Sequence, residues 1–539
     1  MIDYLKKRKS LLLLCLVYLL IRLPFLNQQF LLHDERDIIL SGYSIARTGR
    51  DLFGNFMPLS FNHISPDNPL FAIYFSALWW LIIPIKSVFL ARLPFVLITT
   101  SLVFIVHELI YQITANKKLS FLTMLLFCFS PWVFHITRLA LDIPLAIVTL
   151  TLGMLFYLKR KTALSFFMFF LTFYTYQGFR TIIPFLLIYL ELFFFLKTKD
   201  RKLFIKKNVI NVIFFILLSL SIFFVDAKVT EKRFSQLVFL NPTRFVEDVN
   251  YKRNTSIAPP LIKVIFHNKF TATVNYMITN FVKGQDLLYL FKEGDTSPIN
   301  GNVSTGQFFF TAIFFYYLGI VSFGKKKKPQ DFFPLGLIPI GLIPAILSNV
   351  SSTFSIRAMA SGIGFAYIIA CGIIFASRIA KNMSKTIQII CGISILIIFG
   401  FDLIYFSYNY FFRRPIIVAE SFFENERQLA KFLIDKKKPF TVYARFPQDN
   451  YLSLILVESG KINWYTIQSN LRKGQPFLWN NKIIRDCGSQ TNFESLSDAI
   501  ISEQCLNPQE YKYFSFLHPP YPNIPYNDLS YKEAYFITK

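Results

Sequence analysis

Twelve apolar runs dominate the sequence, and they constrain the fold more than any other feature. A transmembrane helix needs about 20 predominantly apolar residues to cross the hydrocarbon core of a bilayer. Hydrophobic residues make up 53% of the chain, which is more than a soluble protein of this length can bury. The sequence therefore predicts an all-α polytopic membrane protein. The runs cover residues 11–26, 70–85, 88–113, 119–136, 142–158, 162–177, 181–196, 208–225, 306–323, 331–347, 357–377 and 386–408.

Basic residues between the runs predict how the chain crosses the membrane, because cytoplasmic loops carry an excess of Lys and Arg. With twelve crossings, the basic loops would lie opposite the basic N-terminal residues 6–9. If the run 70–85 lies along the outer surface, all the basic connections fall on the cytoplasmic side. Trp79 and Trp80 suit such an interfacial helix. We therefore expect about eleven spans in the plasma membrane and a cytoplasmic N-terminus. The basic connections are 117–118, 159–161, 197–207, 325–328 and 378–385.

This arrangement sends the long polar segments to the outer side of the membrane. They are a first outer loop at 27–87, a second at 226–305, and everything after about residue 410. The net charge of +25 lies largely in short loops, so it reflects membrane orientation, and no nucleic-acid partner is expected. We divide the chain into a membrane domain, 1–410, and a soluble extracytoplasmic domain, 411–539.

The C-terminal domain is predicted to be a small α/β domain. Apolar residues at helical spacing predict a helix over 419–437, and residues 440–446 and 451–460 fit two strands or a strand and a helix. Cys487 and Cys505 lie in this region. They either pair in an oxidising compartment or remain free thiols.

Motifs for metals and nucleotides are missing from the sequence. There is no C-x-x-C pair, no zinc spacing and no G-x-x-x-x-G-K-[ST] loop. We therefore expect no cofactor and no metal site, and we do not expect an enzyme driven directly by a nucleotide.

The polar stretch 31–69 begins with three titratable residues, His33, Asp34 and Glu35. Acidic side chains this close to a membrane are costly unless they face water, a partner or a substrate. One interpretation is that the two acids cap a helix over 35–48, since acidic residues favour a helix N-terminus. The other is that one of them is a catalytic base. The residues alone leave both open.

Short motifs recur along residues 1–410, and their order resembles that of the GT-C glycosyltransferases that use polyprenyl-phosphate sugars. The most similar group contains the protein O-mannosyltransferases and the aminoarabinose transferases. The motifs are Asp34-Glu35; Thr48-Gly49 with Asp51, Gly54 and Pro58; Pro69-Leu70; Arg92-Leu93-Pro94; Ser130-Pro131-Trp132 with Arg138 and Asp142; Tyr176–Arg180; Gly294-Asp295; and Ser355–Arg357.

The resemblance implies an integral-membrane glycosyltransferase that acts on the extracytoplasmic face. It would move a sugar from a polyprenyl-phosphate donor to a hydroxyl of a protein, lipid or glycan acceptor, with inversion at the anomeric carbon. Asp34 is the first choice for the base and Glu35 the second. Some distant members of the superfamily use a divalent ion, although no tight ligand spacing predicts one here.

The leaving lipid phosphate needs cations, and the sequence offers arginines near the outer ends of the spans. Arg binds phosphate bidentately and stays charged, but it also extends from a span to the lipid headgroups without any catalytic role. Relatives often carry His or Lys directly before the prolines at the start of the helix expected over 70–85, where this chain has Asn68 before Pro69. Either His63 or Lys86 takes the phosphate-binding role, or the arginines carry it alone. The candidates for lipid-phosphate or sugar binding are Arg357, Arg180, Arg138, Arg92, His63 and Tyr176.

Arg138 and Asp142 stand four residues apart, so on one helix they would share a face. They either form an ion pair that makes a membrane-edge turn tolerable, or Asp142 orients an arginine or the acceptor. Tyr176 either contacts sugar or belongs to the aromatic belt of the interface.

Two other functions remain as alternatives: a flippase or transporter of lipid-linked glycans, and a polymerase or ligase of surface glycans. A transporter would favour charges deep inside the spans and repeats between its halves. The charges of this chain gather at the outer ends of the runs instead, which favours the transferase.

Overall fold

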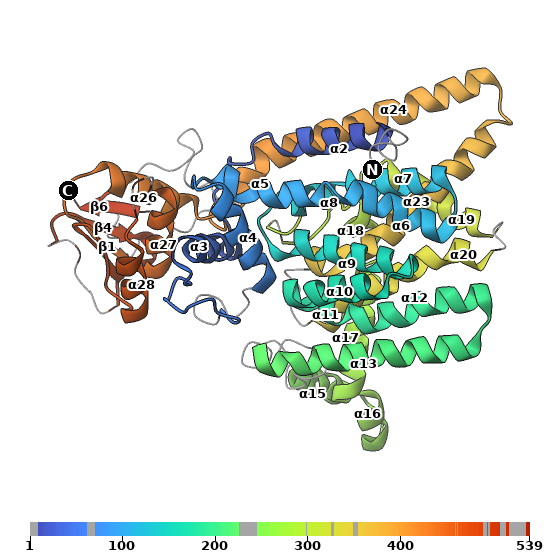
Figure 1. Ribbon diagram of the computed structural model, residues 1–539, viewed down its shortest axis with the longest axis horizontal. Coiled ribbons are helices and arrows are strands. Elements are labelled where there is room, and N and C mark those ends of the chain that lie inside the picture. Colours follow the sequence, from blue (N-terminus) through green and yellow to red (C-terminus); the bar gives the residue numbers. More distant parts are fainter. Residues whose placement is uncertain are drawn as a thin grey trace. The chain divides into compact units, whose positions relative to one another are not determined.

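A computed structural model describes most of the chain, and the chain forms two compact units. The bundle unit contains residues 1–22, 95–138 and 142–409, and the loop–sheet unit contains 23–94, 139–141 and 410–539. Each unit is described separately (Figure 1). The described residues are 9–61, 70–225, 245–297, 299–324, 328–348, 354–458, 460, 462–488, 493, 496–506, 514–516 and 535–538.

The helices and strands assigned to the described residues of the bundle unit are all helices. In chain order its elements are α2 (Lys9–Arg22), α6 (Leu102–Thr114), α7 (Lys117–Cys128), α8 (Pro131–Ile136), α9 (Asp142–Leu158), α10 (Thr162–Thr175), α11 (Gln177–Arg180), α12 (Ile182–Thr198), α13 (Arg201–Val225), α15 (Val246–Asn254), α16 (Pro260–Phe266), α17 (Lys269–Lys283), α18 (Leu287–Phe291), α19 (Ala312–Phe323), α20 (Pro329–Phe332), η3 (Phe333–Gly336), α21 (Leu337–Leu347), α22 (Phe354–Ala358), η5 (Met359–Ser361), α23 (Gly362–Ala380) and α24 (Lys385–Tyr408).

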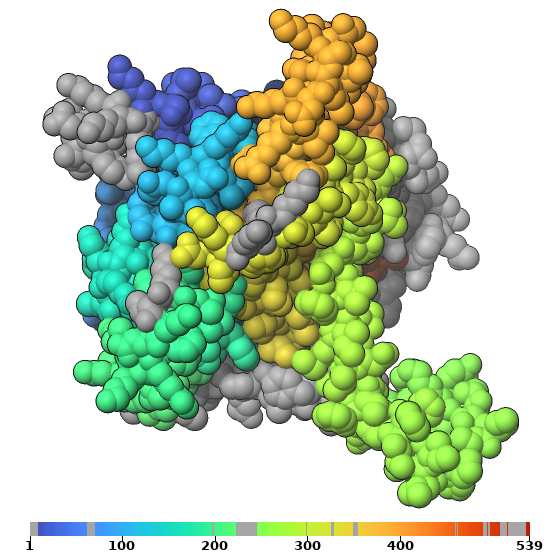
Figure 2. Space-filling view, turned by 90° about the vertical axis from the view of Figure 1, so that its right-hand side faces the viewer, coloured from blue at the N-terminus to red at the C-terminus, as the bar shows by residue number. Residues whose placement is uncertain are grey.

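Five helical stretches in the described part of the chain are long and apolar enough to cross a membrane: Val88–Thr114, Arg201–Ile222, Pro329–Leu347, Phe354–Ala380 and Lys385–Ile417. Shorter apolar helices, such as α9 and α10, accompany them. The prediction of a helical, multi-pass membrane protein is confirmed, whereas eleven spans remain a prediction. The side chains of α24 are largely exposed, and Figure 2 shows this helix in orange, standing out from its neighbours. Exposed apolar side chains on such a helix suit contact with lipid.

Small residues let neighbouring helices of the bundle approach closely. A Cβ on Gly319 of α19 would lie 2.1 Å from the carbonyl oxygen of Ile368, and one on Gly372 of α23 would lie 1.7 Å from that of Phe315. Any side chain at either position would force the two helices apart. Glycines at helix contacts are typical of membrane bundles, where close packing replaces the hydrophobic effect as the driving force.

The loop–sheet unit combines the first outer loop with the C-terminal segment. Its helices are α3 (His33–Thr48), α4 (Leu70–Ile82), α25 (Arg414–Ile417), α26 (Glu424–Asp435), α27 (Pro447–Val457) and α28 (Trp464–Lys473). Its strands are β1 (Thr441–Ala444), β2 (Phe477–Trp479), β3 (Lys482–Asp486), β4 (Ala499–Ser502), β5 (Phe514–Phe516) and β6 (Tyr535–Thr538). α5 (Val88–Thr99) and the π-helix η6 (Asn409–Arg413) span the unit boundaries, and η7 (Glu503–Cys505) follows β4.

The sheet has the order β2-β3-β1-β4-β6-β5. β1 pairs in parallel with β3 and β4, so Val442 stands between Ile484 and Ile500. The remaining pairs are antiparallel. The two central strands, β1 and β4, are mostly apolar and buried, as expected for strands covered on both faces. The predicted α/β domain is therefore confirmed, and residues 451–460 mostly form the second half of a helix, α27, rather than a strand.

The first outer loop and the C-terminal segment share one hydrophobic core. Leu40 and Leu52 from the loop pack with a cluster from the sheet and its helices that includes Leu433 and Tyr451. α4 packs on α3, where a Cβ on Gly42 would lie 2.7 Å from Ser76 Oγ. The run 70–85 thus contributes α4 to this unit, as a non-crossing run requires. The division into folding domains at residue 410 remains a prediction.

Cys487 and Cys505 form a disulfide that joins the end of β3 to η7, with Cα atoms 5.8 Å apart. The sequence left this pairing open. The segment that the bond encloses includes β4.

Candidate active site

The acidic pair Asp34-Glu35 lies in the first turn of α3. Glu35 Oε2 accepts a hydrogen bond from the Leu32 amide at 3.0 Å, which satisfies one of the free N–H groups at the helix start. The helix ends at Gly49, whose φ of 68° is the left-handed conformation that glycine adopts without strain. The prediction that an acid caps this helix is confirmed for Glu35.

Glu35 is fully buried and paired with Arg92. Arg92 Nε donates to Oε1 at 2.8 Å and Nη2 donates to Oε2 at 2.7 Å, while the Ala140 amide donates to Oε1 at 2.7 Å. The other N–H groups of Arg92 bind the carbonyls of Leu26, Gln29 and Phe30. All five donors of Arg92 are therefore used inside the loop. This geometry favours a structural role for both residues.

Asp34 is the exposed member of the pair, with 68% of its side chain accessible. His33 Nδ1 lies 3.6 Å from Asp34 Oδ1 and 3.4 Å from Oδ2 of Asp37, so one imidazole stands between two carboxylates. The hydrogen bond to Asp34 raises the pKa of His33. A protonated His33 would thus hold Asp34 in place at the start of the helix.

Arg36 and Asp37, next along α3, were not identified from the sequence. Both are fully buried, and Arg36 Nη2 donates to Asp449 Oδ1 at 2.7 Å. Burial raises the pKa of Asp37 to about 6, and in the described structure neither of its oxygens has a hydrogen-bond partner. The spacing of His33 and Asp37, i and i+4, places them on one helix face and was a usable signal. No sequence pattern pointed to Asp449.

The turn after α3 is built by Asp51. Its Oδ1 accepts from the amides of Phe53 at 2.9 Å and Asn55 at 2.8 Å. Gly54 has a φ of 85°, which a side chain would strain. The Gly49, Asp51 and Gly54 motif therefore shapes the turn and closes the first part of the loop.

Arg138 and Asp142 belong to the bundle unit. Arg138 Nη1 donates to the carbonyl of buried Arg22 at 2.9 Å, and its guanidinium lies 5.2 Å from the Phe134 ring. The two residues do not share a helix, because α8 ends at Ile136 and α9 begins at Asp142. The common helix face expected for them is therefore wrong.

The other bundle candidates lie at short helices. Arg180 Nε donates to the Phe173 carbonyl at 2.9 Å, and the guanidinium lies 4.9 Å from the Phe173 ring. Tyr176 precedes α11 and packs edge-on against Phe179, with ring centroids 5.0 Å apart. Arg357, on α22, donates to Ser348 Oγ.

Two motifs meet at α22. Asp295 Oδ2 accepts from the Ser355 amide at 2.6 Å, and Oδ1 accepts from the Ser297 amide at 3.0 Å. The Gly294-Asp295 motif thus holds the start of the helix that carries Arg357.

The candidate site residues are divided between the two units. Asp34, Glu35 and Arg92 lie in the loop–sheet unit, and Arg138, Asp142, Tyr176, Arg180 and Arg357 lie in the bundle unit. Lys86 donates to the Ile455 carbonyl, and burial lowers its pKa to about 8. His63 lies outside the described residues.

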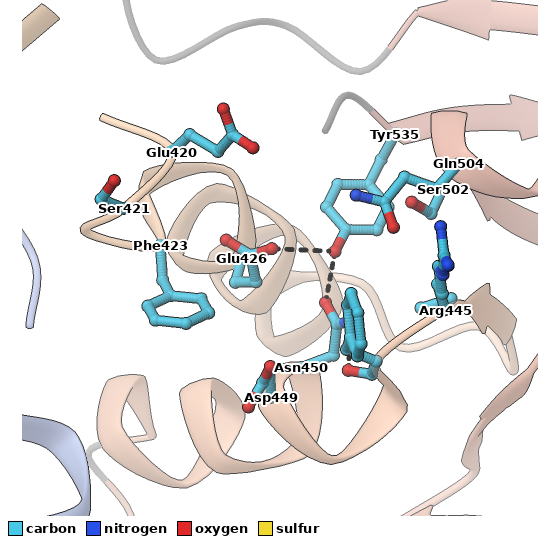
Figure 3. A pocket seen from close by; sticks show the side chains of 12 residues that line it. Glu420, Ser421, Phe423, Glu426, Arg445, Asp449, Asn450, Ser502, Gln504 and Tyr535 are labelled. Carbon is cyan, nitrogen blue, oxygen red and sulfur yellow. Dashed lines mark hydrogen bonds between the residues drawn. The ribbon is translucent and has the colours of Figure 1, made fainter. Parts of the chain in front are cut away.

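A pocket of about 340 Å³ opens in the loop–sheet unit (Figure 3). The Tyr535 hydroxyl donates to Asn450 Oδ1 at 2.7 Å and lies 3.3 Å from Glu426 Oε1. The sequence did not indicate this pocket, because its residues come from separate elements. They are Glu420, Ser421, Phe423, Glu426, Ala444, Arg445, Phe446, Asp449, Asn450, Ser502, Gln504 and Tyr535.

Side chains that bind metals do not gather in the described residues: no group of three or more His, Cys, Asp or Glu there is placed to hold an ion. The expectation that the protein needs no cofactor stays a prediction.

The fold is that of a polytopic helical membrane protein with a small mixed α/β domain. No protein-family profile and no curated protein matches the chain. Among solved structures it is similar to the oligosaccharyltransferase AglB from Archaeoglobus fulgidus in complex with an inhibitory peptide and a dolichol-phosphate, with 12% identity, 97% of this chain and 75% of that chain covered, and a TM-score of 0.46. It is also similar to ArnT from Cupriavidus metallidurans bound to undecaprenyl phosphate, with 9% identity, 98% and 97% covered, and a TM-score of 0.46. Because both TM-scores are below 0.5, no residue role is taken from these structures. The roles proposed below rest on the contacts within this chain.

Proposed function

We propose that the protein is an integral-membrane glycosyltransferase that moves a sugar from a polyprenyl-phosphate donor to an acceptor hydroxyl. The environment of Asp34 carries this proposal. Of the two acids that open α3, Glu35 is buried and fully hydrogen-bonded, whereas Asp34 is exposed on a helix that Glu35 and Arg92 fix in place. An exposed carboxylate on a rigid support is what a general base needs. The order of the sequence motifs supports the same function.

In the proposed reaction, Asp34 removes the proton from the acceptor hydroxyl. The acceptor oxygen then attacks the anomeric carbon of the donor and forms the new glycosidic bond. The bond between that carbon and the phosphate oxygen breaks, and the lipid phosphate leaves with the electron pair. A single displacement of this kind inverts the anomeric centre.

Cations must balance the charge that develops on the departing phosphate. Arg357, Arg180 and Arg138 are the proposed phosphate ligands, with His63 as a further candidate. Asp142 is proposed to orient one of these arginines or the acceptor, and Tyr176 to contact the sugar. Arg92 supports the loop through Glu35. The chemistry is proposed to occur on the outer face, with the N-terminus in the cytoplasm.

The test uses the purified protein and radiolabelled polyprenyl-phosphate monosaccharides with an extract of the cell envelope as acceptor. Asp34→Asn should lower transfer at least about 100-fold, the usual size of a general-base contribution, and leave folding intact. Asp435→Asn changes an exposed acid at the far end of α26 and should leave transfer unchanged.

Undiminished transfer by Asp34→Asn would refute the assignment of the base. Movement of intact donor between leaflets without release of lipid phosphate would favour the flippase, and extension of long glycan chains would favour the polymerase or ligase.

A further inference from the structure

The pocket of the loop–sheet unit lies where the topology of the sheet opens a crevice. β1 and β4 are adjacent and parallel. The chain leaves β1 toward β3, by way of α27, α28 and β2, and leaves β4 in the opposite direction, toward β6 and β5. Where connections diverge from the carboxyl ends of neighbouring parallel strands, α/β sheets characteristically bind ligands.

Residues that follow the two strands line this crevice. Arg445 and Phe446 come directly after β1, and Ser502 and Gln504 stand at the end of β4. Figure 3 shows Arg445, Gln504 and Tyr535 around one side of the opening. The pocket is therefore a consequence of strand order rather than a chance surface hollow.

The charge of the lining favours a cationic ligand. Three carboxylates, Glu420, Glu426 and Asp449, line the pocket with one guanidinium, Arg445. Even with Arg36, which pairs with Asp449, the carboxylates outnumber the guanidiniums by one. An acidic pocket disfavours phosphate and other anions and attracts a protonated amine.

The remaining groups suit a polyhydroxylated ligand. The Gln504 amide carries both donors and an acceptor for hydroxyl groups, and the Tyr535 hydroxyl, whose proton is donated to Asn450, offers an acceptor. Asn450 and Tyr535 are each 3% exposed and bonded to one another, so these polar groups are pre-positioned. The ring of Phe446 is 54% exposed and presents a flat apolar surface for a sugar ring.

The pocket wall is also joined to the helix that carries the proposed base. Asp449 Oδ1 accepts from Arg36 Nη2 at 2.7 Å, and the Arg36 guanidinium lies 4.7 Å from the ring of Phe423. Arg36 is two residues from Asp34 on α3. We propose that this pocket binds an amino-sugar residue of the glycosyl acceptor, an inference that rests on the proposed glycosyltransferase function.

Binding is tested first, with the full-length protein in detergent and two tetrasaccharides that differ only in charge. One is made of glucosamine, at about pH 6 where its amines are protonated, and the other of N-acetylglucosamine. Calorimetry should show the glucosamine tetramer binding at least about tenfold more tightly. Glu426→Gln and Phe446→Ala should each weaken that binding about tenfold, and Asp435→Asn should not change it.

Two substitutions are used because Glu426→Gln alone could weaken binding by disturbing the fold. Glu426 is buried, whereas Phe446 is largely exposed, so Phe446→Ala leaves the core intact. Equal affinity of the wild-type protein for the two tetramers, no binding of the glucosamine tetramer, or unchanged binding by Phe446→Ala would each overturn the pocket's assignment.

Transfer is measured next, as release of lipid phosphate from the labelled donor with and without the glucosamine tetramer. The tetramer should become labelled, and Phe446→Ala should raise its KM about tenfold with kcat little changed. If the tetramer binds but no donor is turned over with either the tetramer or envelope acceptors, the pocket stands as a saccharide site and the glycosyltransferase function fails. If transfer to envelope acceptors proceeds with the same KM in Phe446→Ala, the function stands and the acceptor role of the pocket fails.

Discussion

Two adjacent carboxylates at the start of α3 have opposite environments. The sequence shows that Asp34 and Glu35 matter, but it cannot show which one is free. Glu35 is held in the interior by Arg92, 57 residues away in the sequence, and by the Ala140 amide, 105 residues away. Contacts over such separations have no local signature, so both acids remained candidates for the base until the fold was known.

Replacing Glu35 tests its structural role. Glu35→Gln leaves the buried guanidinium of Arg92 without its counter-charge, and breaking a buried pair in this way costs about 3 to 5 kcal/mol. We expect a clearly lower melting temperature in detergent, measured by intrinsic fluorescence. The matched control is the neighbouring Asp34→Asn, which should melt within a degree or two of the wild type. Equal melting temperatures for the two variants would contradict this structural role.

The buried Asp37 gives the loop–sheet unit a pH dependence. Its folded pKa of about 6 lies above the value of about 3.9 of an unfolded aspartate. Between these values the folded state holds a proton that the unfolded state has lost, so stability falls as pH rises from about 4 to about 6. His33, whose pKa is also raised, adds stability at low pH that is lost as pH rises through its folded pKa. Asp37→Asn should make the melting temperature depend less on pH between about 4 and about 6, and it should raise the melting temperature at pH 7. If the melting temperature of the variant changed with pH in the same way as that of the wild type, Asp37 would not be the source of the pH dependence.

At the scale of elements, continuous apolar runs predicted the helices well where one run makes one helix. The run 142–158 is α9, and 162–177 contains α10. The run 119–136 is broken at Ser130-Pro131, because proline cannot continue the α7 helix. The strand order and the pocket it creates could not be predicted, since parallel pairing of β1 with β3 and β4 depends on residues far apart in sequence.

The disulfide between the end of β3 and η7 makes a prediction for this part of the sheet. It closes a loop between residues 18 apart, so removing it should cost about 3 kcal/mol. The double variant Cys487→Ser/Cys505→Ser should therefore melt at a lower temperature. In the denatured wild type, a maleimide should modify Cys487 and Cys505 only after reduction, whereas Cys391, which is free, should react without it. Modification of both residues without reduction would show that the bond is not formed.

At the scale of the whole molecule, the composition of the loop–sheet unit constrains the topology. Residues 23–94, 139–141 and 410–539 form one compact unit, so we expect them to lie on one side of the membrane. The chain must then cross an even number of times between 94 and 139, and again between 141 and 410. The predicted spans number two in the first interval and eight in the second. The even numbers required by the packing of the loop–sheet unit therefore agree with the topology predicted from the basic loops.

This topology predicts from which side of the membrane cysteines introduced one at a time can be labelled. The exposed Cys391 is first replaced by serine. Phe56→Cys in the first loop and Tyr465→Cys in α28 are 72% and 80% exposed positions of one unit. Both should react with a membrane-impermeant maleimide on intact cells. Lys381→Cys, in the exposed turn before α24, should react only after permeabilisation, because α24 separates it from residue 410. Labelling of Phe56→Cys and Tyr465→Cys from opposite sides would show that the loop and the sheet do not share a core. Labelling of all three from outside would show that α24 does not cross, and would put the base and the acceptor pocket on the same face as the basic loops.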